Sequence, residues 1–497
     1  MSQLFRTKNI DQLIAASNDP GRRLAKTLGP WSLAALGIGA VIGSGIFILT
    51  GTAAAGEVRS FESILHAPLL DIVLNGSDSL ARIGRPGAGP GIALSFILVA
   101  IACSFAALCY AELASMIPIA GSAYTYAYAT LGEIFAWIIG WDLILEYAVS
   151  NMAVAVGFSA YFNDLLLVLF GVTLPPHLSQ PMVAGGQLTG SWFNLPAALI
   201  LGLLTMLLVR GVRESAGANN IMVVLKIAAI LIFVVGAAPA IKTENWHPFM
   251  PNGFPGVLTG AAIVFFTYIG FDSVSTAAEE CKTPQRDLPF GIIVSLIVCT
   301  LLYVSVALTL TGIANWKTLN NAAPVANALK ALGYDAIRKW VDLGALVGMI
   351  SSLLVFQYGQ ARVWFAMSRD RLLPDAFSRI HPRFQTPHIS TLAAGVAVGI
   401  PAGIWDIGTF ADLSNIGTLF AFIIVSAGVL RLRQTQPDRP RGFRVPLVPY
   451  LPIFSIVCCL ILMTSLPLET WVRFFVWLLI GLAVYYFYGR HRTEGHV

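Results

Sequence analysis

Long apolar runs alternate with short polar stretches along most of this chain. The run from Leu195 to Val209 (LPAALILGLLTMLLV), for example, contains no charged residue. A helix needs roughly 20 apolar residues to cross a bilayer core of about 30 Å. The pattern therefore predicts twelve membrane-spanning helices, at residues 31–53, 91–117, 133–166, 192–210, 219–240, 257–279, 289–314, 339–367, 388–405, 409–430, 447–467 and 470–489.

The composition agrees with this pattern over the whole length of 497 residues. Hydrophobic residues make up 56% and charged residues 11%, whereas soluble domains carry about 25% charged residues. The mean hydropathy of +0.74 shows that the apolar excess is not confined to one anchor. We therefore expect a polytopic membrane protein, and a soluble enzyme, a nucleic-acid binder or a disordered scaffold is a poor fit.

The positions of the basic residues predict the orientation. Of the 31 lysines and arginines, 21 lie in segments on the side of the N-terminus, nine on the other side, and Lys226 within span 5. The positive-inside rule therefore predicts that both termini are cytoplasmic, in a multi-pass protein of the cell's inner (cytoplasmic) membrane. Residues 1–30 lack an apolar core, so no cleavable signal peptide is expected. The net charge of +5 is thus a sign of topology and not of an acidic partner.

Several kinds of membrane chemistry have no matching motif. The seven histidines lie in loops, at span ends or at a terminus, so neither a metal site nor a haem site is predicted. No GxxxxGK[ST] motif is present to drive transport with ATP, and no span is rich in arginine like a voltage sensor. Five of the six cysteines fall within spans, which argues against a disulfide framework. A carrier, a channel or a membrane sensor remains, with no cofactor expected.

Two predicted spans contain helix-breaking sequences. Span 1 includes GIGAVIGSGIFILTG (37–51) and span 6 includes FFTYIGFDSVSTAAEE (265–280). Each glycine costs about 1 kcal/mol in a helix interior, so the Gly43-Ser44-Gly45 triplet predicts a break, although close packing through small residues is the alternative for Gly37 and Gly39. Interrupted helices at corresponding positions of inverted halves mark the substrate site of a transporter. Free N–H groups there attract a carboxylate, and freed carbonyls accept from an ammonium group.

Four segments carry a family resemblance. GIGAVIGSGIF in span 1, YAELASMIPIAGSAYTYAYATLGE after span 2, GFDSVSTAAEECKTPQRDLP after span 6 and AMSRDRLLP after span 8 resemble the amino acid–polyamine–organocation superfamily. More narrowly, they are similar to its cationic amino acid transporters and their bacterial relatives, over roughly residues 20–490. The long outer loop at 57–90 is the main departure from the family; its apolar stretch from Ile64 to Leu74 suggests a short interfacial helix.

The resemblance implies an all-α membrane protein with the leucine-transporter-type fold. Two inverted five-helix repeats, 31–240 and 257–430, would form a transport core (31–430) with discontinuous helices 1 and 6. Two additional helices would follow at 447–489, with cytoplasmic segments at 1–30 and 490–497.

The resemblance also implies a substrate site. The unwound bracket for the substrate carboxylate would comprise Ile42, Gly43, Ser44, Gly45 and Ile46. The carbonyls offered to the α-amino group would be those of Phe266, Thr267 and Ile269. Tyr268 or Phe271 would be an aromatic gate, unless it is simply packed, and Asp272 would either cap the inner half-helix or contact the substrate.

Lys226 is the most informative single residue. It lies seven residues past Asn219 in an apolar run, roughly 10 Å into the helix. A lysine at this depth either snorkels to the interface or faces a cavity. In the superfamily, sodium-coupled members place Na⁺ between spans 1 and 8, whereas some proton-coupled relatives have a span 5 lysine whose ammonium occupies that space. Lys226 matches that lysine, which implies proton symport with the span 8 hydroxyls of Ser351 or Ser352 nearby.

Glu146 in span 3 is a second ionisable residue within the membrane. It is either a neutral, hydrogen-bonded side chain or, as the resemblance implies, part of the substrate pocket. Asp142 lies on the same helical face without a clear role. In span 8, the bulky residues Leu354, Val355 and Phe356 suggest a narrow apolar wall, and no carboxylate besides Glu146 obviously awaits a cationic side chain. We therefore expect neutral or a broad range of L-amino acids.

Three functional hypotheses remain. The first is an importer of L-amino acids that works by alternating access and is driven by the proton motive force. The second is an exchanger or uniporter in which Lys226 is structural. The third is a membrane amino acid sensor, although the polar tails leave little room for a signalling domain. An enzyme is not expected. The lipid bilayer is the expected environment; a small single-span partner and the oligomeric state stay open.

Overall fold

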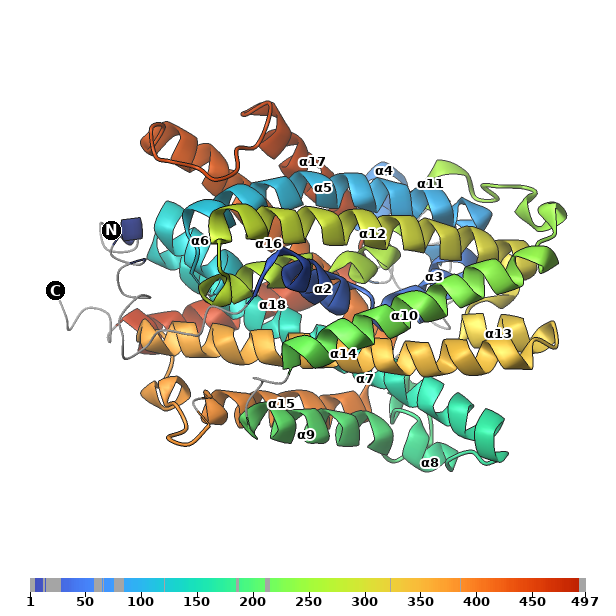
Figure 1. The fold of residues 1–497 in the computed structure, drawn as a ribbon. Coiled ribbons are helices and arrows are strands. Elements are labelled where there is room, and N and C mark those ends of the chain that lie inside the picture. Colours follow the sequence, from blue (N-terminus) through green and yellow to red (C-terminus); the bar gives the residue numbers. More distant parts are fainter. Residues whose placement is uncertain are drawn as a thin grey trace.

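The molecule is an elongated bundle of helices that run roughly along one axis (Figure 1). The computed structural model describes residues 5–11, 14, 28–57, 65, 67–75, 85–119, 121–184, 187–210, 215–321, 323–384 and 386–490. Most of the predicted N-terminal segment 1–30, much of the predicted outer loop 57–90 and the tail after residue 490 lie outside these residues.

The described part of the chain contains eight helical stretches that are long and apolar enough to cross a membrane. They overlap helices α5 (Ile92–Met116), α7 (Glu133–Phe170), α10 (Ser215–Ala237), α11 (Gly253–Val264), α12 (Pro284–Ile313), α14 (Asp335–Arg369), α16 (Ile407–Thr435) and α18 (Leu468–Val484). Three shorter apolar helices are α9 (Leu195–Arg210), α15 (His388–Ile404) and α17 (Tyr450–Thr464). Each lies where the sequence predicts a span.

Predicted span 1 is a broken helix. Helix α2 (Pro30–Val41) and helix α3 (Ser44–Ala55) meet at an angle of 44°. The break therefore covers Ile42 and Gly43, and it is narrower than the predicted bracket. Ser44, Gly45 and Ile46 belong to the first turn of α3, because helical geometry resumes directly after Gly43.

Predicted span 6 is also interrupted. Helix α11 ends at Val264 and is followed by the 3₁₀ turn η6 (Phe265–Tyr268), by extended backbone at Ile269 and by a left-handed Gly270 (φ 124°). The inner half continues as the 3₁₀ helix η7 (Phe271–Glu280) instead of an α-helix. A 3₁₀ helix of ten residues is unusually long.

Short elements connect the main helices. Helix α6 (Ser122–Thr130) joins α5 to α7, α8 (Pro176–Ser179) follows α7, and α13 (Pro324–Ala331) precedes α14. Strands β1 (Gly56–Glu57) and β2 (Arg85–Pro86) pair antiparallel, as do β3 (Val183–Ala184) and β4 (Gln187–Leu188). The remaining turns are η3 (Gly89–Gly91), η4 (Ala238–Ala240), η5 (Thr243–Trp246), η8 (Trp316–Thr318), η9 (Asp375–Ser378) and the π-turn η10 (Tyr485–Gly489). Helix α4 (Leu69–Asn75) overlaps the helix predicted in the outer loop, whereas residues 58–64, 66 and 76–84 lie outside the described chain.

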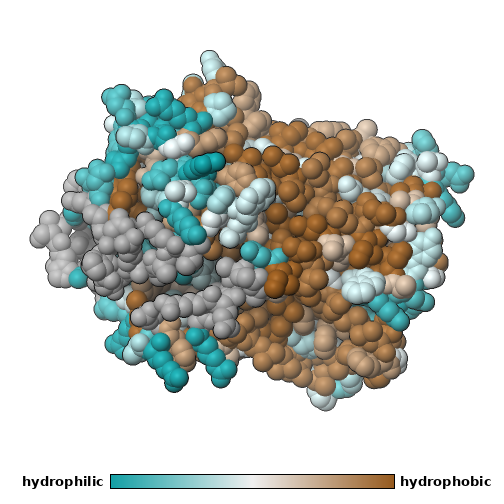
Figure 2. All heavy atoms as spheres, viewed as in Figure 1, coloured by the Kyte–Doolittle hydropathy of each residue, from teal (hydrophilic) through white to brown (hydrophobic). Residues whose placement is uncertain are grey.

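The surface has the distribution expected of a membrane protein. A broad apolar belt separates two polar ends (Figure 2). The described residues near both ends of the chain lie at the same polar end: Lys8 pairs with Asp370 after α14, and Tyr485 donates to Glu133 at the start of α7. We call this end the terminal end and the opposite one, which carries the β1–β2 pair and α13, the far end.

Helices α7 and α14 pack more extensively against each other than any other pair of helices, and α14 also contacts α2, α3 and η7 of the broken helices. Helix α18 is fastened to α7 through indole groups. Trp141 Nε1 donates to Trp477 O at 2.9 Å, and Trp477 Nε1 donates back to Trp141 O at 3.1 Å, with the two rings stacked 4.6 Å apart. Trp137 Nε1 donates to Gly481 O at 2.8 Å. Such bonds are stable in an apolar surrounding because no water competes for the groups.

Candidate functional site

The break in helix 1 exposes the backbone carbonyls at the end of α2. The last carbonyls of a helix have no intrahelical partner and must find one elsewhere when they are buried. Val41 O accepts from Gly43 N at 3.0 Å, while Gly39 O, Ala40 O and Ile42 O accept from side chains of other helices. The local sequence thus creates acceptors, and the surrounding helices provide donors.

Lys226 supplies an amine donor. Its side chain is fully buried (0% exposed), and Nζ donates to Gly39 O at 2.7 Å and to Ile42 O at 3.0 Å. The ammonium group therefore does not snorkel to the surface. Gly348 on α14 lies beside its aliphatic stem: a Cβ on Gly348 would lie 3.4 Å from Lys226 Cβ and Cδ, an ordinary van der Waals contact.

Both serines predicted from span 8 reach the same carbonyls. Ser352 Oγ lies within hydrogen-bonding distance of Gly39 O (2.9 Å), Ala40 O and Ile42 O (both 3.1 Å). Ser351 Oγ lies 3.5 Å from Gly39 O and donates more closely to Asn219 Oδ1, at 2.8 Å. The structure thus brings Lys226, Ser351 and Ser352 together around the end of α2.

The break in helix 6 lies directly against the break in helix 1. A Cβ on Gly270 would lie 2.8 Å from Ala40 Cβ, and a Cβ on Gly45 would lie 2.7 Å from Thr267 Cγ2. Gly270 also has a positive φ of 124°, which side chains rarely adopt. Both glycines are therefore needed for the two interruptions to meet.

Tyr303 on α12 joins the two breaks, and our sequence analysis missed it. Its hydroxyl oxygen lies 2.8 Å from both Val41 O and Thr267 O. One hydroxyl carries a single proton, so the two carbonyls share one donor. The available signal was a lone tyrosine in the middle of an apolar run, since a buried tyrosine hydroxyl usually finds a partner.

The beginning of α3 offers donors for an anion. The first N–H groups of a helix lack intrahelical partners and carry partial positive charge. Ser44, the first residue of α3, is buried, and its Oγ has no hydrogen-bond partner among the described residues. Helix α7 comes close to it, because a Cβ on Gly157 would lie 2.6 Å from Ser44 Cβ.

Three buried carboxyl groups gather on the terminal side of the breaks. Glu146 and Asp142 come from α7 and Asp272 from η7, and their electrostatic interactions place them close together. Tyr147 Oη donates to Asp272 Oδ2 at 3.3 Å, whereas Asp272 Oδ1, Glu146 Oε2 and both Asp142 oxygens have no partner within the described chain. Gly270 is the residue that precedes η7, and Asp272 lies in the first turn of η7, so its role as a cap or as a substrate contact stays a prediction. The sequence singled out Glu146 as the one carboxylate available to a cationic side chain, and the structure places Asp142 and Asp272 beside it.

The aromatic side chains named as gates are both packed. Tyr268 Oη donates to Phe96 O at 3.1 Å and its ring lies 5.2 Å from that of Tyr303. Phe271 packs edge-on against Tyr110, 6.1 Å away. A gating role for either ring stays a prediction.

The residues predicted to supply carbonyls and a pocket wall are buried as well. Phe266 O accepts from Ile269 N at 3.2 Å, and Thr267 O is shared with Tyr303. In α14, Leu354, Val355 and Phe356 are buried, and the ring of Phe356 lies 6.1 Å from that of Tyr147.

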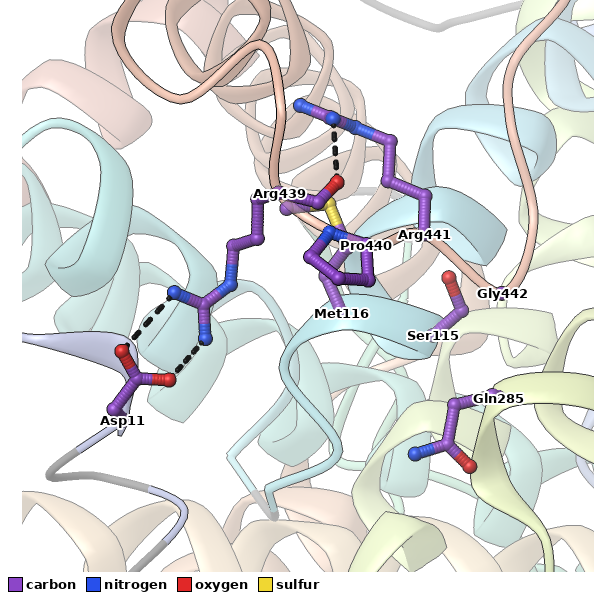
Figure 3. Close-up of a pocket in the computed structure, with 8 residues that line it drawn as sticks. All are labelled: Asp11, Ser115, Met116, Gln285, Arg439, Pro440, Arg441 and Gly442. Carbon is purple, nitrogen blue, oxygen red and sulfur yellow. Dashed lines mark hydrogen bonds and ion pairs between the residues drawn. The ribbon is translucent and has the colours of Figure 1, made fainter.

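A separate pocket of about 600 Å³ opens at the terminal end (Figure 3). It is lined by Asp11, Ser115, Met116, Gln285, Arg439, Pro440, Arg441 and Gly442. Its charged groups are already paired: Arg439 with Asp11, and Arg441 with the buried Glu112. The pocket therefore belongs to the network that fixes the loop between α16 and α17, and not to the two breaks.

The described residues contain no group of three or more histidine, cysteine or acidic side chains placed to hold a metal ion. The chemistry that the site offers is thus recognition: donors at the beginning of α3, acceptors at both breaks, and a buried ammonium group beside them.

The sequence matches the family model described as amino acid permease over residues 28–485. It is 46% identical to the branched-chain amino acid permease BcaP of Bacillus subtilis (strain 168) over 494 residues, which cover 99% of this chain and 98% of that one. It is 45% identical to the methylthioribose transporter of the same organism over 493 residues, 99% of each chain. It is 33% identical to the chloroplastic cationic amino acid transporter 9 of Arabidopsis thaliana over 548 residues, 97% of this chain and 90% of the relative. These matches confirm the resemblance predicted from the four motifs, and all three relatives are named as transporters and not as enzymes.

Proposed function

We propose that this chain, which belongs to the amino acid permease family, is a secondary active transporter that imports L-amino acids by proton-coupled symport. Its substrate would bind between the two breaks, and no cofactor would be needed because the proton motive force supplies the energy. The observation that carries the proposal is the meeting of two interrupted helices around a buried lysine.

The backbone at the breaks is chemically suited to an amino acid. The substrate carboxylate would accept from the first N–H groups of α3 and from Ser44 Oγ, which has no other partner in the described chain. The α-amino group would donate to Thr267 O and its neighbours, because Tyr303 has one proton to share between two carbonyls. Both substrate charges would then be matched by backbone dipoles.

Lys226 is proposed as the proton carrier. Its ammonium group holds Gly39 O and Ile42 O at the end of α2, so it favours the arrangement in which the inner half of helix 1 lies against α10 and α14. A buried amine tends to lose its proton, and Lys226 would then release these carbonyls and free α2 to move. Proton binding and the position of α2 would in this way be coupled.

The proposed architecture has twelve spans with both termini in the cytoplasm. The broken helix α2–α3 with α5, α7, α9 and α10 would form the first repeat. The broken helix α11–η7 with α12, α14, α15 and α16 would form the inverted second repeat, followed by α17 and α18. The far end would face outward and the terminal end inward, in keeping with the excess of lysine and arginine there.

Neutral L-amino acids are the substrates that we propose to test first. One relative at 46% identity is named for branched-chain amino acids, and the buried Leu354, Val355 and Phe356 suit an apolar side chain. Because another relative at 45% identity is named for methylthioribose, that compound is a necessary competitor.

The test is uptake of labelled leucine into proteoliposomes with and without an inward proton gradient, competed by the other amino acids and by methylthioribose. We expect the gradient to drive accumulation in the natural protein and Lys226→Ala to abolish gradient-driven accumulation. Lys317→Ala, which removes an exposed lysine at the far end, should behave like the natural protein.

Each alternative has its own outcome. Uptake without stimulation by protons, with Lys226→Ala undiminished, would mean an exchanger or a uniporter. Binding without uptake would mean a sensor. Competition by methylthioribose but by no amino acid would contradict the proposed substrate class.

A further inference from the structure

Arg85 forms a buried ionic cluster at the far end of the molecule. Its side chain is 2% exposed, and its guanidinium group binds Asp412 through two bonds, from Nη1 to Oδ1 at 2.9 Å and from Nη2 to Oδ2 at 2.6 Å. Nε and Nη2 both lie 2.9 Å from Glu57 Oε2. Arg85 lies near the end of the outer loop predicted at 57–90.

The backbone around Arg85 is fixed to the end of α3. Glu57 and Arg85 face each other in the β1–β2 pair, and Ala88 N donates to Ala53 O, in the last turn of α3, at 2.9 Å. A Cβ on Gly87 would lie 2.4 Å from Ala54 O, so only glycine permits this approach. Residues 85–88 and the end of α3 therefore form one unit, and the Arg85 guanidinium group extends from that unit to Asp412 on α16.

The same part of α16 also holds the outer half of helix 6. Asn415, three residues after Asp412, donates through Nδ2 to Ala262 O on α11 at 2.8 Å. The beginning of α16 is thus linked to both outer half-helices: to α3 indirectly, through Arg85 and the backbone of residues 85–88, and to α11 directly, through the Asn415 amide.

We propose that Arg85 is a positioning residue that holds α3 to α16 and thereby keeps closed the path between the far end of the molecule and the proposed substrate site. We call the Arg85–Asp412 interaction the latch. The inference rests on the proposed transport function. Helix α3 has 12 residues, or about 18 Å at 1.5 Å per residue, with the substrate-binding N–H groups at one end and the latch at the other. When the passage opens, the Arg85–Asp412 bonds break as α3 leaves α7 and α16.

The latch is mechanical and does not depend on pH in the physiological range. Burial by itself would lower the pKa of the Arg85 guanidinium, but Asp412 and Glu57 outweigh burial and hold that pKa above its ordinary value. Arg85 therefore stays charged, and the two parallel bonds of its fork fix one orientation of α3.

The accessibility of α3 tests the proposal. Ile48 on α3 is buried and faces α7, because a Cβ on Gly157 would lie 2.8 Å from Ile48 Cδ1. In an Ile48→Cys parent in nanodiscs, we expect slow reaction with a charged methanethiosulfonate reagent, and the protein without this cysteine gives the background. Adding Arg85→Met should speed the reaction at least tenfold, whereas Arg85→Lys, which keeps the charge but loses the fork, should have an intermediate effect.

A charge-neutral variant separates the latch from misfolding. Arg85→Met alone removes the positive charge that faces Glu57 and the buried Asp412, which is costly; adding Glu57→Gln and Asp412→Asn removes all three charges. This triple variant should elute as a folded species, label at least tenfold faster than the parent, and show a lower Vmax for leucine uptake with a KM changed less than threefold. Arg473→Met removes an arginine from an i,i+4 pair on α18, and it should label at the parental rate.

Equal labelling rates in the parent and in the folded triple variant would overturn the latch, as would equal acceleration by Arg473→Met. If the Ile48→Cys parent and the natural protein take up no amino acid, the proposed function fails. The labelling comparison would still report separately on the latch.

Discussion

Replacing Tyr303 by phenylalanine removes one oxygen atom from the junction of the two breaks. The ring should stay in place, because it packs 5.5 Å from Phe96 and 5.2 Å from Tyr268. After the change, Val41 O still accepts from Gly43 N, whereas Thr267 O loses the partner described above. The variant therefore differs from the natural protein by one buried carbonyl without a donor.

The magnitude follows from that single orphaned acceptor. A buried polar group without a partner costs about 1–3 kcal/mol, so the substrate-free protein should lose about that much stability. The proposed substrate ammonium group donates to Thr267 O and would remove the penalty on binding. Tyr303→Phe should therefore bind leucine about 5- to 150-fold more tightly than the natural protein does, although it is less stable without substrate.

The assay is thermal unfolding of the purified protein in detergent, with and without leucine. The expected result is a lower unfolding temperature in the absence of leucine and a larger rise on its addition. Tyr161→Phe is the matched control: its hydroxyl donates to Phe47 O at 3.0 Å, inside α3 and away from Thr267. That variant should lose stability without the larger response to leucine. A response of Tyr303→Phe equal to or smaller than that of the natural protein would refute the placement of the ammonium group.

Two further substitutions test the backbone and the packing. Gly270→Ala should lower stability by about 1–3 kcal/mol from its positive φ alone and reduce the yield of monodisperse protein. Gly399→Ala, with no atom within 4 Å of the added Cβ, should change neither. Equal yields of the two variants on size-exclusion chromatography would contradict this role for Gly270. Trp141→Phe removes the indole donor to Trp477 O. In thermal unfolding it should lower the stability by about 1 kcal/mol, and it should leave the KM for leucine unchanged. Trp192→Phe, at an exposed position, should have no effect, and a loss of affinity in Trp141→Phe would show that α18 influences the site.

The positions of the helices could be predicted from the sequence because a membrane span is a local property. The ends of the apolar runs locate the ends of the helices to within several residues, and the Gly43-Ser44-Gly45 triplet indicated the break in helix 1. The width of that break could not be predicted from the sequence. Glycine lowers the cost of leaving the helix, but the packing of Ser44 against Gly157 lets α3 resume immediately.

Partners that are distant in the sequence could not be predicted. Tyr303 meets Val41 O 262 residues earlier, and Tyr147 meets Asp272 125 residues later. Lys226 was the exception, because the family resemblance implied a position for its amino group between spans 1 and 8, and the structure places Nζ at Gly39 O and Ile42 O of span 1. Arg85 gave no such signal, because an arginine in a polar loop is ordinary and its burial depends on the return of the chain to α3.

The indole bonds between α7 and α18 have a consequence for the order of assembly. Trp141 and Trp477 are separated by 336 residues, so α7 is synthesised long before its partner exists. Until α18 is made, the indole N–H groups of Trp137 and Trp141 lie in an apolar surrounding without their acceptors, the carbonyls of Gly481 and Trp477 respectively. A ribosome halted before α18 would thus leave a bundle in which two indole donors of α7 lack the carbonyl acceptors that α18 supplies.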